Sequence, residues 1–310
     1  MTSLPAMTSP LLPSRFADWF ASRGWAAREH QLAMIEKGRQ GRDALLIAPT
    51  GGGKTLAGFL PSLIELSERP APNGPRGIHT LYLSPLKALA VDVERNLLAP
   101  INEMDLNIVA ESRTGDTGVS RKQRQKLKPP DMLLTTPEQL ALLLAWEGAQ
   151  GFFEDLSCVI IDEIHTLWPS KRGDLLALGL SRLQALAPKM RRVGLSATVD
   201  DPEIILDWLG ARPGAVELVR GPPGPLPVVD VLISEGRVPW AGHTAQHAMG
   251  DVYEIIKQHR TTLIFVNTRF QAEYAFQELW KLNDDSLPTA LHHGTPSPEQ
   301  RHTLKATMAH

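Results

Sequence analysis

The sequence has little of several features, and each shortage excludes a class of protein. It has a single cysteine, Cys158, so no intramolecular disulfide can form, and a core thiol in a reducing compartment is the simplest interpretation. No apolar run approaches the roughly 20 residues of a membrane-spanning helix. Neither sign of charge dominates, because 32 Lys and Arg residues face 34 Asp and Glu residues, for a net charge of -2. That balance excludes a uniformly basic nucleic-acid coat but leaves room for a local basic groove.

The N-terminal segment also lacks targeting features. It contains prolines and no basic stretch followed by an apolar core, so we expect residues 1–15 to form a flexible tail and not a signal peptide. The whole sequence is 43% hydrophobic and 21% charged, a composition typical of soluble globular proteins. A length of 310 residues suits about two domains. We therefore expect a cytoplasmic protein of two domains.

Short apolar runs alternate with amphipathic segments along the first 220 residues. The expected strands are 44–48, 80–84, 107–110, 132–135, 158–162, 192–196 and 215–219. The expected helices lie between them, at 56–66, 86–98, 138–146, 174–186 and 202–209. Continuous apolar strands that alternate with helices predict an α/β fold, in which a parallel sheet is covered by helices on both faces.

A proline-rich segment, G-P-P-G-P-L-P at 221–227, is the clearest domain boundary, because it can continue neither a helix nor a central strand. We predict a first domain at 16–220, a linker at 221–227 and a second α/β domain at 228–310. In the second domain the expected strands are 228–233, 262–266 and 288–292, and the expected helices are 248–259 and 271–282. Because only 83 residues follow residue 227 (310 minus 227), we expect this second domain to be incomplete.

A glycine-rich segment, A-P-T-G-G-G-K-T at Ala48–Thr55, follows one predicted strand and precedes a predicted helix. Consecutive glycines allow backbone N–H groups to converge on phosphate oxygens, and the positive end of the following helix adds to that attraction. Lys54 is expected to reach the β- and γ-phosphates, and the Thr55 hydroxyl to coordinate Mg²⁺. The predicted nucleotide contacts in this P-loop are Thr50, Gly51, Gly52, Gly53, Lys54 and Thr55.

An acidic pair ends a second buried strand. Asp162 and Glu163 follow the run V-I-I, so we expect them at the carboxyl edge of the sheet, where α/β proteins bind ligands. Asp162 is predicted to hold Mg²⁺, directly or through water, and Glu163 to orient and deprotonate the attacking water. The P-loop and the acidic pair together predict hydrolysis of a nucleoside triphosphate.

Two further motifs narrow the function. His165 completes D-E-I-H, and S-A-T occupies Ser196–Thr198 directly after another predicted strand. In this order after a P-loop, the motifs resemble those of the superfamily 2 DExH-box helicases, whose histidine and Ser/Thr hydroxyls link the γ-phosphate site to nucleic acid. The resemblance implies RecA-like domains, coupling roles for Ser196 and Thr198, and a catalytic set made of Lys54, Asp162, Glu163 and His165.

Other positions match the same family in order. Gln31, in R-E-H-Q, matches the glutamine that reads adenine, which implies ATP as the nucleotide. The segments L-S-P-L-K-A-L, R-T-G-D-T and T-T-P-E-Q-L match nucleic-acid motifs of the first domain, and F-V-N-T-R and L-H-H-G-T match motifs of the second. Such loops contact a sugar-phosphate backbone without reading bases, and Lys87 and Arg113 are the expected phosphate-binding side chains. The implied nucleic-acid contacts are Pro85, Lys87, Arg113, Thr114, Gly115, Thr136, Pro137, Glu138, Asn267, Thr268, Arg269, His293 and Gly294.

The whole series, with S-K-R-G-D at 170–174 and W-A-G-H at 240–243, resembles the Lhr-like helicases, and among them the bacterial ligase-associated DEXH-box helicases. This implies ATP-driven 3′-to-5′ translocation on single-stranded or partly duplex DNA, a DNA-repair role at the nucleoid, and a ligase and a nuclease as partners. Family members continue into motif VI, which supplies arginines to the γ-phosphate. Because that motif does not occur in these 310 residues, we expect this chain to bind ATP but to hydrolyse it poorly, since an arginine finger contributes roughly 10³–10⁵-fold.

Several alternatives stay open at this point. An RNA helicase is one, because backbone contacts separate DNA from RNA poorly and the 2′-hydroxyl is what distinguishes them. An ATP-gated binding module without efficient hydrolysis is another. The basic run at 121–128 is either an extension of the nucleic-acid track or a solvated helix face. His243 and His247 lack the glutamate of a zinc motif and are not interpreted as metal ligands.

Overall fold

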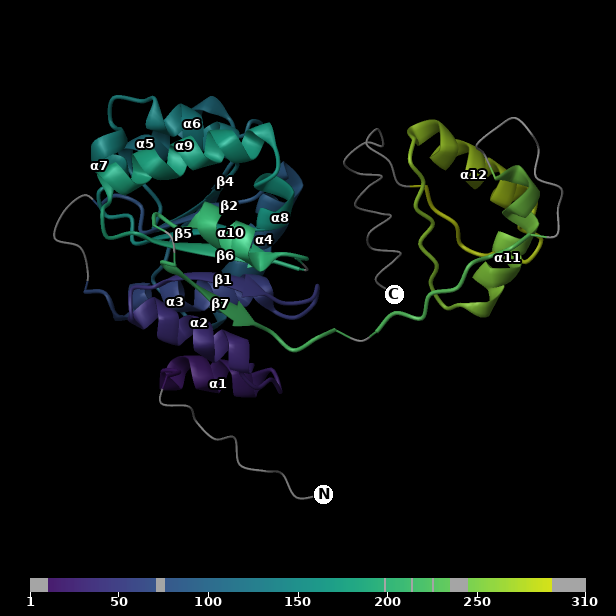
Figure 1. The fold of residues 1–310 in the computed structure, drawn as a ribbon, viewed down its shortest axis with the longest axis horizontal. Coiled ribbons are helices and arrows are strands. Elements are labelled where there is room, and N and C mark those ends of the chain that lie inside the picture. The colour runs from purple at the N-terminus through teal and green to yellow at the C-terminus, as the bar shows by residue number, and fades with distance from the viewer. Residues whose placement is uncertain are drawn as a thin grey trace, which may run out of the picture. The chain divides into compact units, whose positions relative to one another are not determined.

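A computed structural model describes residues 11–70, 76–197, 199–212, 214–224, 226–234 and 245–291. The chain divides into two compact units, residues 1–225 and 226–310, so the division falls inside the proline-rich segment. Each unit is described by itself below (Figure 1).

The first unit is built around a seven-stranded sheet in the order β3-β4-β2-β5-β6-β1-β7, and all of its strand pairs are parallel. Its strands are β1 (Asp43–Ile47), β2 (Thr80–Leu83), β3 (Ala110–Arg113), β4 (Met132–Thr135), β5 (Cys158–Ile161), β6 (Arg191–Ser196) and β7 (Val216–Arg220). Every residue of β2, β4, β5 and β6 is buried, which explains why these strands read as continuous apolar runs. The prediction of a parallel sheet is confirmed.

Helices cover both faces of this sheet, and each face has its own hydrophobic core (Figure 1). One core contains residues of α1 (Ser14–Ser22), α2 (Glu29–Arg39), α3 (Lys54–Glu68) and α4 (Lys87–Glu103). The other contains residues of α6 (Pro137–Leu144), α7 (Ala149–Phe153), α8 (Ile164–Leu167), α9 (Lys171–Leu186) and α10 (Pro202–Leu209). Alternate strand residues such as Leu45 and Leu46 point to opposite cores, as the two-residue period of a strand requires. No helix of the described ranges has the length and apolar character that crossing a bilayer requires.

The structure corrects one strand of the first unit and adds helices. The strand expected at 107–110 is β3 at Ala110–Arg113, because the ladder with β4 begins at the pair Ala110 and Met132. Before that pair the Val109 N–H donates to the Asp131 carboxylate and not to a neighbouring strand. Helices α1, α2, α7 and α8 had no counterpart among the predicted helices. The basic run forms α5 (Val119–Leu127), which packs on the edge strand β3 through Gln125.

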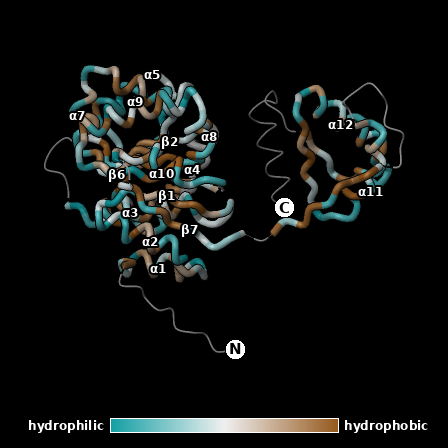
Figure 2. The backbone as a smooth tube through the Cα atoms, viewed as in Figure 1, coloured by the Kyte–Doolittle hydropathy of each residue, from teal (hydrophilic) through white to brown (hydrophobic). Residues whose placement is uncertain are grey.

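The second unit contains a 3₁₀ turn, η1 (Gln246–Ala248), and two packed helices, α11 (Met249–Gln258) and α12 (Arg269–Lys281). The strands predicted at 228–233 and 262–266 are wrong, and residues 288–291 of the third are not in a strand either. Figure 2 shows hydrophobic stretches in this unit that lie outside its helices. A strand requires a ladder with a neighbour, and the described residues of this unit form none, so side chains such as Val228 (91% exposed) and Phe265 (88% exposed) stay uncovered.

Candidate nucleotide and nucleic-acid site

Three neighbouring strands bring the predicted nucleotide residues together. The P-loop follows β1, Ser196 ends β6, and Asp162 follows β5, and these strands are adjacent in the order β5-β6-β1. The Ala48 N–H donates to the Ser196 carbonyl at 3.1 Å, which extends the ladder to the start of the P-loop. The carboxyl ends of parallel strands share one edge of the sheet, so three motifs that are distant in sequence meet there.

The glycines of the P-loop are required by its backbone. Gly51 and Gly53 have φ values of 75° and 77°, a region that side chains with a Cβ rarely adopt. Gly52 lies so close to its own turn that a Cβ would be 2.7 Å from the Pro49 carbonyl oxygen. The loop leads directly into α3, whose first residue, Lys54, is 7% exposed. The P-loop therefore has the form that cradles phosphate at a helix N-terminus.

Residues at the start of α2 contact the backbone of the P-loop. Arg28 Nη1 donates to the Gly51 carbonyl at 3.3 Å, and His30 Nε2 lies 2.9 Å from the Gly52 carbonyl, which can only accept a hydrogen bond. Burial lowers the pKa of His30, so the neutral ring is favoured with its proton on Nε2. Gln31 accepts the Arg28 backbone N–H at 2.9 Å. Only Gln31 of these three was predicted, although Arg28 and His30 belong to the same R-E-H-Q run.

A cavity of about 740 Å³ opens over the P-loop. Its lining includes Gln31, Trp25 and Glu163 together with the P-loop residues Thr50, Gly51, Gly53, Lys54 and Thr55. Trp25 is 51% exposed, and its ring contacts Trp19 edge-on and the Arg23 guanidinium, which lies 5.1 Å from the ring centroid. The volume is in the range of small-molecule sites, and the cavity has a phosphate cradle and an aromatic wall as a nucleotide requires. Nothing in the sequence singles out Trp25 among the seven tryptophans.

Asp162 is held by two donors inside the sheet edge. The Tyr82 hydroxyl donates to Oδ2, and the Glu163 backbone N–H donates to Oδ1 at 2.9 Å. Burial raises the pKa of Asp162, and the bond from Tyr82, the Glu163 N–H and the nearby Lys54 oppose that rise. Burial and the adjacent carboxylate raise the pKa of Tyr82, so the phenol keeps its proton and remains a donor. Tyr82 was not predicted, because a buried aromatic residue in a strand has the same pattern as a core residue.

Glu163 and His165 are arranged around Ser196. Glu163 has a φ of 45° at the start of α8, an uncommon conformation for a residue with a side chain, and it lines the cavity. His165 Nδ1 lies 2.8 Å from Ser196 Oγ and 3.6 Å from Glu163 Oε2. One imidazole therefore connects the acidic pair to the end of β6. Thr198 lies outside the described residues.

The oxygen donors predicted for Mg²⁺ fit that ion. Asp162 offers a buried carboxylate directly after β5, and Thr55 offers a hydroxyl that lines the cavity over the P-loop, and hard oxygen ligands of this kind suit Mg²⁺. Among the described residues no group of three or more His, Cys, Asp or Glu side chains could hold a metal ion.

The predicted nucleic-acid loops of this unit follow three more strands, β2, β4 and β3, at the same edge. Two hydrogen bonds join them, from the Ser84 N–H to the Thr135 carbonyl at 3.0 Å and from Thr135 Oγ1 to the Arg113 carbonyl at 2.7 Å. Most of the predicted contact residues in these loops are buried, namely Pro85, Arg113, Thr114, Thr136 and Pro137. Gly115 and Glu138 are exposed.

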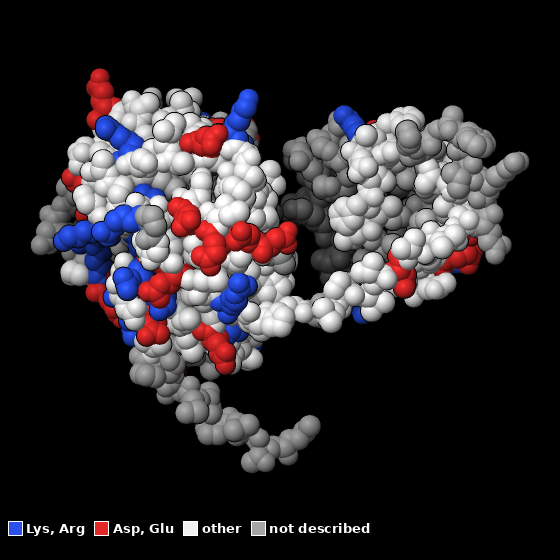
Figure 3. Space-filling view, in the orientation of Figure 1, with Lys and Arg blue, Asp and Glu red and all other residues white. Residues whose placement is uncertain are grey.

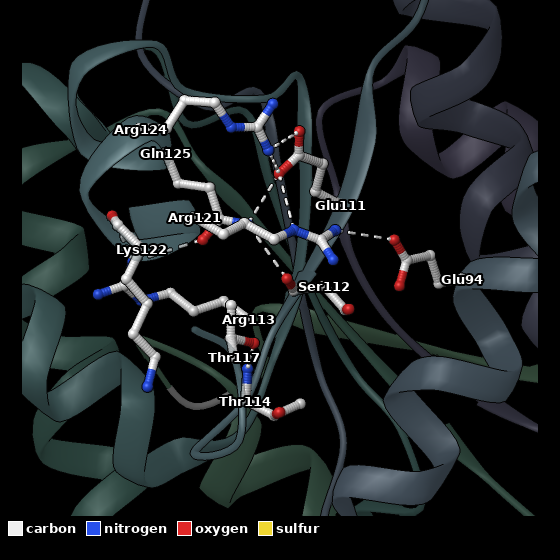
Figure 4. A network of polar contacts seen from close by, with 10 residues as sticks. All are labelled: Glu94, Glu111, Ser112, Arg113, Thr114, Thr117, Arg121, Lys122, Arg124 and Gln125. Carbon is white, nitrogen blue, oxygen red and sulfur yellow. Dashed lines mark hydrogen bonds and ion pairs between the residues drawn. The ribbon is translucent and has the colours of Figure 1, made fainter. Parts of the chain in front are cut away.

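Arg113, which is predicted as a phosphate-binding side chain, is buried in the structure. Its guanidinium is 5% exposed and points at α5, where Nη1 donates to the Lys122 carbonyl at 3.0 Å and to Gln125 Oε1 at 3.4 Å (Figure 4). Burial lowers the pKa of Arg113. Lys122 in turn donates to the Gly115 carbonyl at 2.9 Å. Arg113 and Lys122 thus hold the R-T-G-D-T loop against α5.

The basic run is partly neutralised by carboxylates. Glu111 accepts from Arg124 at 2.7 Å and forms an ion pair with Arg121 at 3.5 Å, and Arg121 also pairs with Glu94 at 3.3 Å (Figure 4). On the face of the first unit seen in Figure 3, cations and carboxylates are likewise intermixed. Of the two interpretations of the basic run, these pairs favour a solvated helix face over an extension of the nucleic-acid track.

Glu138 is paired with a residue that was not among the predicted contacts. Arg172 forms two hydrogen bonds to its carboxylate, and these bonds are the main reason that the pKa of Glu138 is lowered to about 2. A carboxylate that stays charged cannot approach a phosphate favourably, so Glu138 faces an arginine instead. The only sequence signal for Arg172 was its place in S-K-R-G-D.

The remaining predicted contacts are untested by this geometry. The side chain of Lys87, as well as His293 and Gly294, lies outside what the structure describes. Asn267, Thr268 and Arg269 are exposed in the second unit, where Thr268 caps α12 by accepting the Gln271 N–H at 3.2 Å. These residues stay predictions.

Comparison with known proteins agrees with this site. Residues 28–205 match the DEAD/DEAH box helicase family. The chain is 35% identical over 320 residues to the ATP-dependent helicase Lhr-Core of Methanothermobacter thermautotrophicus, covering 92% of this chain and 35% of the relative. It is 35% identical over 303 residues to the Lhr helicase/uracil glycosylase of Escherichia coli, covering 86% of this chain and 19% of the relative.

A solved structure is similar over nearly the whole chain. It is the Mycobacterium smegmatis helicase Lhr bound to single-stranded DNA and AMP-PNP, with a TM-score of 0.75 and 31% identity. The match covers 95% of this chain and 40% of that one. This chain thus spans about a fifth to two fifths of the length of the proteins it matches here.

Proposed function

This chain belongs to the DEAD/DEAH box helicase family, and we propose that it hydrolyses ATP to move along a nucleic-acid strand. One observation supports the proposal: the P-loop, Ser196 and Asp162 lie at the ends of β1, β6 and β5, on the same sheet edge as the predicted nucleic-acid loops after β2, β4 and β3. Ligands at such an edge lie close enough for one to affect the other.

In the proposed hydrolysis, the P-loop N–H groups and Lys54 hold the phosphates, and Trp25 and Gln31 receive the base. Glu163 deprotonates the attacking water, because its carboxylate lines the same cavity. Mg²⁺, when held by Thr55 and Asp162, would neutralise phosphate charge. Tyr82 keeps Asp162 in place by its hydrogen bond.

His165 is proposed to report the state of the nucleotide. Its ring is 2.8 Å from Ser196 and 3.6 Å from Glu163, so a shift of Glu163 on loss of the γ-phosphate would break or make these contacts. Ser196 is the last residue of β6, and its carbonyl accepts a hydrogen bond from the Ala48 N–H at the start of the P-loop. A displacement of Ser196 would therefore move the P-loop and the chain that leads to Thr198.

We propose DNA as the strand, because a relative at 31% identity is described as bound to single-stranded DNA. The 3′-to-5′ direction, the role in DNA repair at the nucleoid and the ligase and nuclease partners rest on family resemblance and are part of the same proposal. The rival is RNA, since loops that contact backbone groups discriminate the two poorly.

The test is the rate of ATP turnover by the 310-residue chain, alone, with a single-stranded oligodeoxynucleotide and with the RNA of the same sequence. Turnover that DNA stimulates more than RNA supports the proposal. Greater stimulation by RNA would make the chain an RNA-dependent ATPase. Binding of ATP with no stimulation by either strand would reduce this chain to an ATP-gated binding module.

A further inference from the structure

Arg172 joins two loops that the proposed function assigns to nucleic acid. Its Nε and Nη2 donate to the two Glu138 carboxylate oxygens at 2.5 and 3.1 Å, and its Nη1 donates to the Pro85 carbonyl at 2.7 Å. The planar guanidinium fits such a forked arrangement, and an ammonium group does not. One side chain therefore bonds to the loop after β2 and to the first turn of α6.

The position of Arg172 is set by the backbone at the start of α9. Ser170 caps α9 by accepting the Gly173 N–H at 3.3 Å. A Cβ on Gly173 would lie 2.3 Å from the Leu167 carbonyl oxygen, so only glycine lets α9 start directly against the end of α8. Helix α8 itself begins directly after Glu163. Arg172 is thus placed by the same segment of chain that bears the acidic pair.

Among the described residues, the hydrogen bonds that join these two segments, apart from those of Arg172, lie at the strand ends. Strands β2 and β4 pair in register up to Leu83 and Thr135, and the Ser84 N–H makes one further bond to the Thr135 carbonyl. Beyond that point the two segments diverge, toward Pro85 and toward α6, and Arg172 is bonded to both. The pair with Glu138 is partly open to solvent, 39% and 49% exposed by side chain, so it contributes little to folding stability.

We propose that Arg172 is a positioning residue for the nucleic-acid surface, which fixes the loop after β2 relative to the first turn of α6 and does not itself contact the strand. This rests on the proposed function, because it assumes that both loops meet one nucleic-acid strand. The Arg172 charge is paired with the Glu138 carboxylate, and its Nε, Nη1 and Nη2 atoms all donate to groups of the protein. Its effect on binding is therefore indirect, through the relative position of two backbone segments.

The experiment measures the dissociation constant of a fluorescent single-stranded oligodeoxynucleotide by anisotropy, for the unaltered chain, Arg172→Lys and Arg172→Ala. Both variants are expected to bind about tenfold more weakly, because hydrogen bonds to charged groups are lost and lysine cannot restore the fork. The matched control is Arg42→Ala, which removes an exposed arginine that pairs with Glu217 at 3.1 Å directly before β1, at the amino edge of the sheet. This control should bind as the unaltered chain does.

A salt series separates positioning from direct contact. If Arg172 does not touch phosphate, the slope of log affinity against log salt stays the same in Arg172→Lys and Arg172→Ala. A slope for Arg172→Ala that is smaller by about 0.7 would show that the guanidinium neutralises a phosphate, and would overturn the proposal. Unaltered affinity in Arg172→Lys would also overturn it, and this variant decides the matter even if Arg172→Ala fails to fold. No binding by the unaltered chain would instead overturn the proposed function, and this inference with it.

Discussion

The two halves of the sheet edge use the same strand ends in different ways. At the ends of β5, β6 and β1 the loops present side chains such as Glu163 and His165, which face one another or a cavity, together with the glycine-rich backbone of the P-loop. After β3, β4 and β2 the predicted contact residues are mostly buried, and Arg113 holds its own loop against α5. Chemistry needs atoms placed to a fraction of an ångström, whereas a sugar-phosphate backbone can be held by amides. The difference teaches that a motif residue can serve by holding a loop as well as by touching a ligand.

The largest expected effect lies in the nucleotide half. Glu163→Gln should lower ATP turnover by about 10²–10⁴-fold, because the amide cannot accept the proton of the attacking water. Nucleotide affinity should be retained, since Glu163 is not part of the phosphate cradle. Steady-state turnover and a fluorescent-nucleotide titration measure the two quantities, with the exposed Glu154→Gln as the control. Normal turnover in Glu163→Gln would show that another group is the base.

Lys54→Ala should weaken ATP binding on the order of a hundredfold, because it removes the charged donor of the phosphate cradle. A titration with fluorescent ATP measures this, and the folded state is checked by circular dichroism. The control is Lys37→Ala, which removes a lysine paired with Glu217 at 2.5 Å, away from the P-loop. Equal ATP affinities of Lys54→Ala and the unaltered chain would show that Lys54 does not bind the phosphates.

In the nucleic-acid half, Arg113→Met should act on stability. Removal of the buried guanidinium deprives the Lys122 carbonyl and Gln125 of a donor, and we expect the free energy of unfolding to fall by about 2 kcal/mol. Urea denaturation measures this, with Arg121→Met as a control, because Arg121 is 42% exposed and its pairs are at the surface. A stable Arg113→Met variant with a reduced salt slope for DNA binding would instead make Arg113 a phosphate contact.

The smallest expected effect is a shift in pH dependence. Tyr82→Phe removes the donor that opposes the raised pKa of Asp162, so the pKa of Asp162 should rise further. The carboxyl group would then stay protonated to higher pH, and the acid limb of the turnover profile should move to higher pH. Turnover measured across pH for Tyr82→Phe, with Tyr253→Phe in the second unit as the control, tests the sign. A shift toward lower pH would contradict it.

The sequence was sufficient for most of the first unit, because its strands are buried on both sides and therefore appear as apolar runs between helices. It was insufficient for the second unit, where the same kind of run at 228–233 and 262–266 has no partner strand in the described residues. An apolar pattern indicates which residues can form a strand, but hydrogen bonding to a neighbour determines whether they do.

The residues of the candidate site also fall into those that the sequence could predict and those that it could not. The P-loop and D-E-I-H residues could be predicted, because their spacing and their strand context suffice to fix a role. Arg28, His30, Tyr82 and Arg172 could not, since each acts through a contact with a residue far away in the chain. Arg113 is predicted as a phosphate contact from its place in R-T-G-D-T, and its hydrogen bonds to α5 could not be predicted from the sequence.

The central claim is that the two halves of the sheet edge act as one device, and the dissociation constant of single-stranded DNA with and without saturating AMP-PNP tests it most directly. We expect AMP-PNP to change DNA affinity at least about fivefold, and DNA to change AMP-PNP affinity by the same factor, as linkage requires. Lys54→Ala should abolish the change. Identical DNA affinity with and without AMP-PNP, in a chain that binds both ligands, would contradict the account.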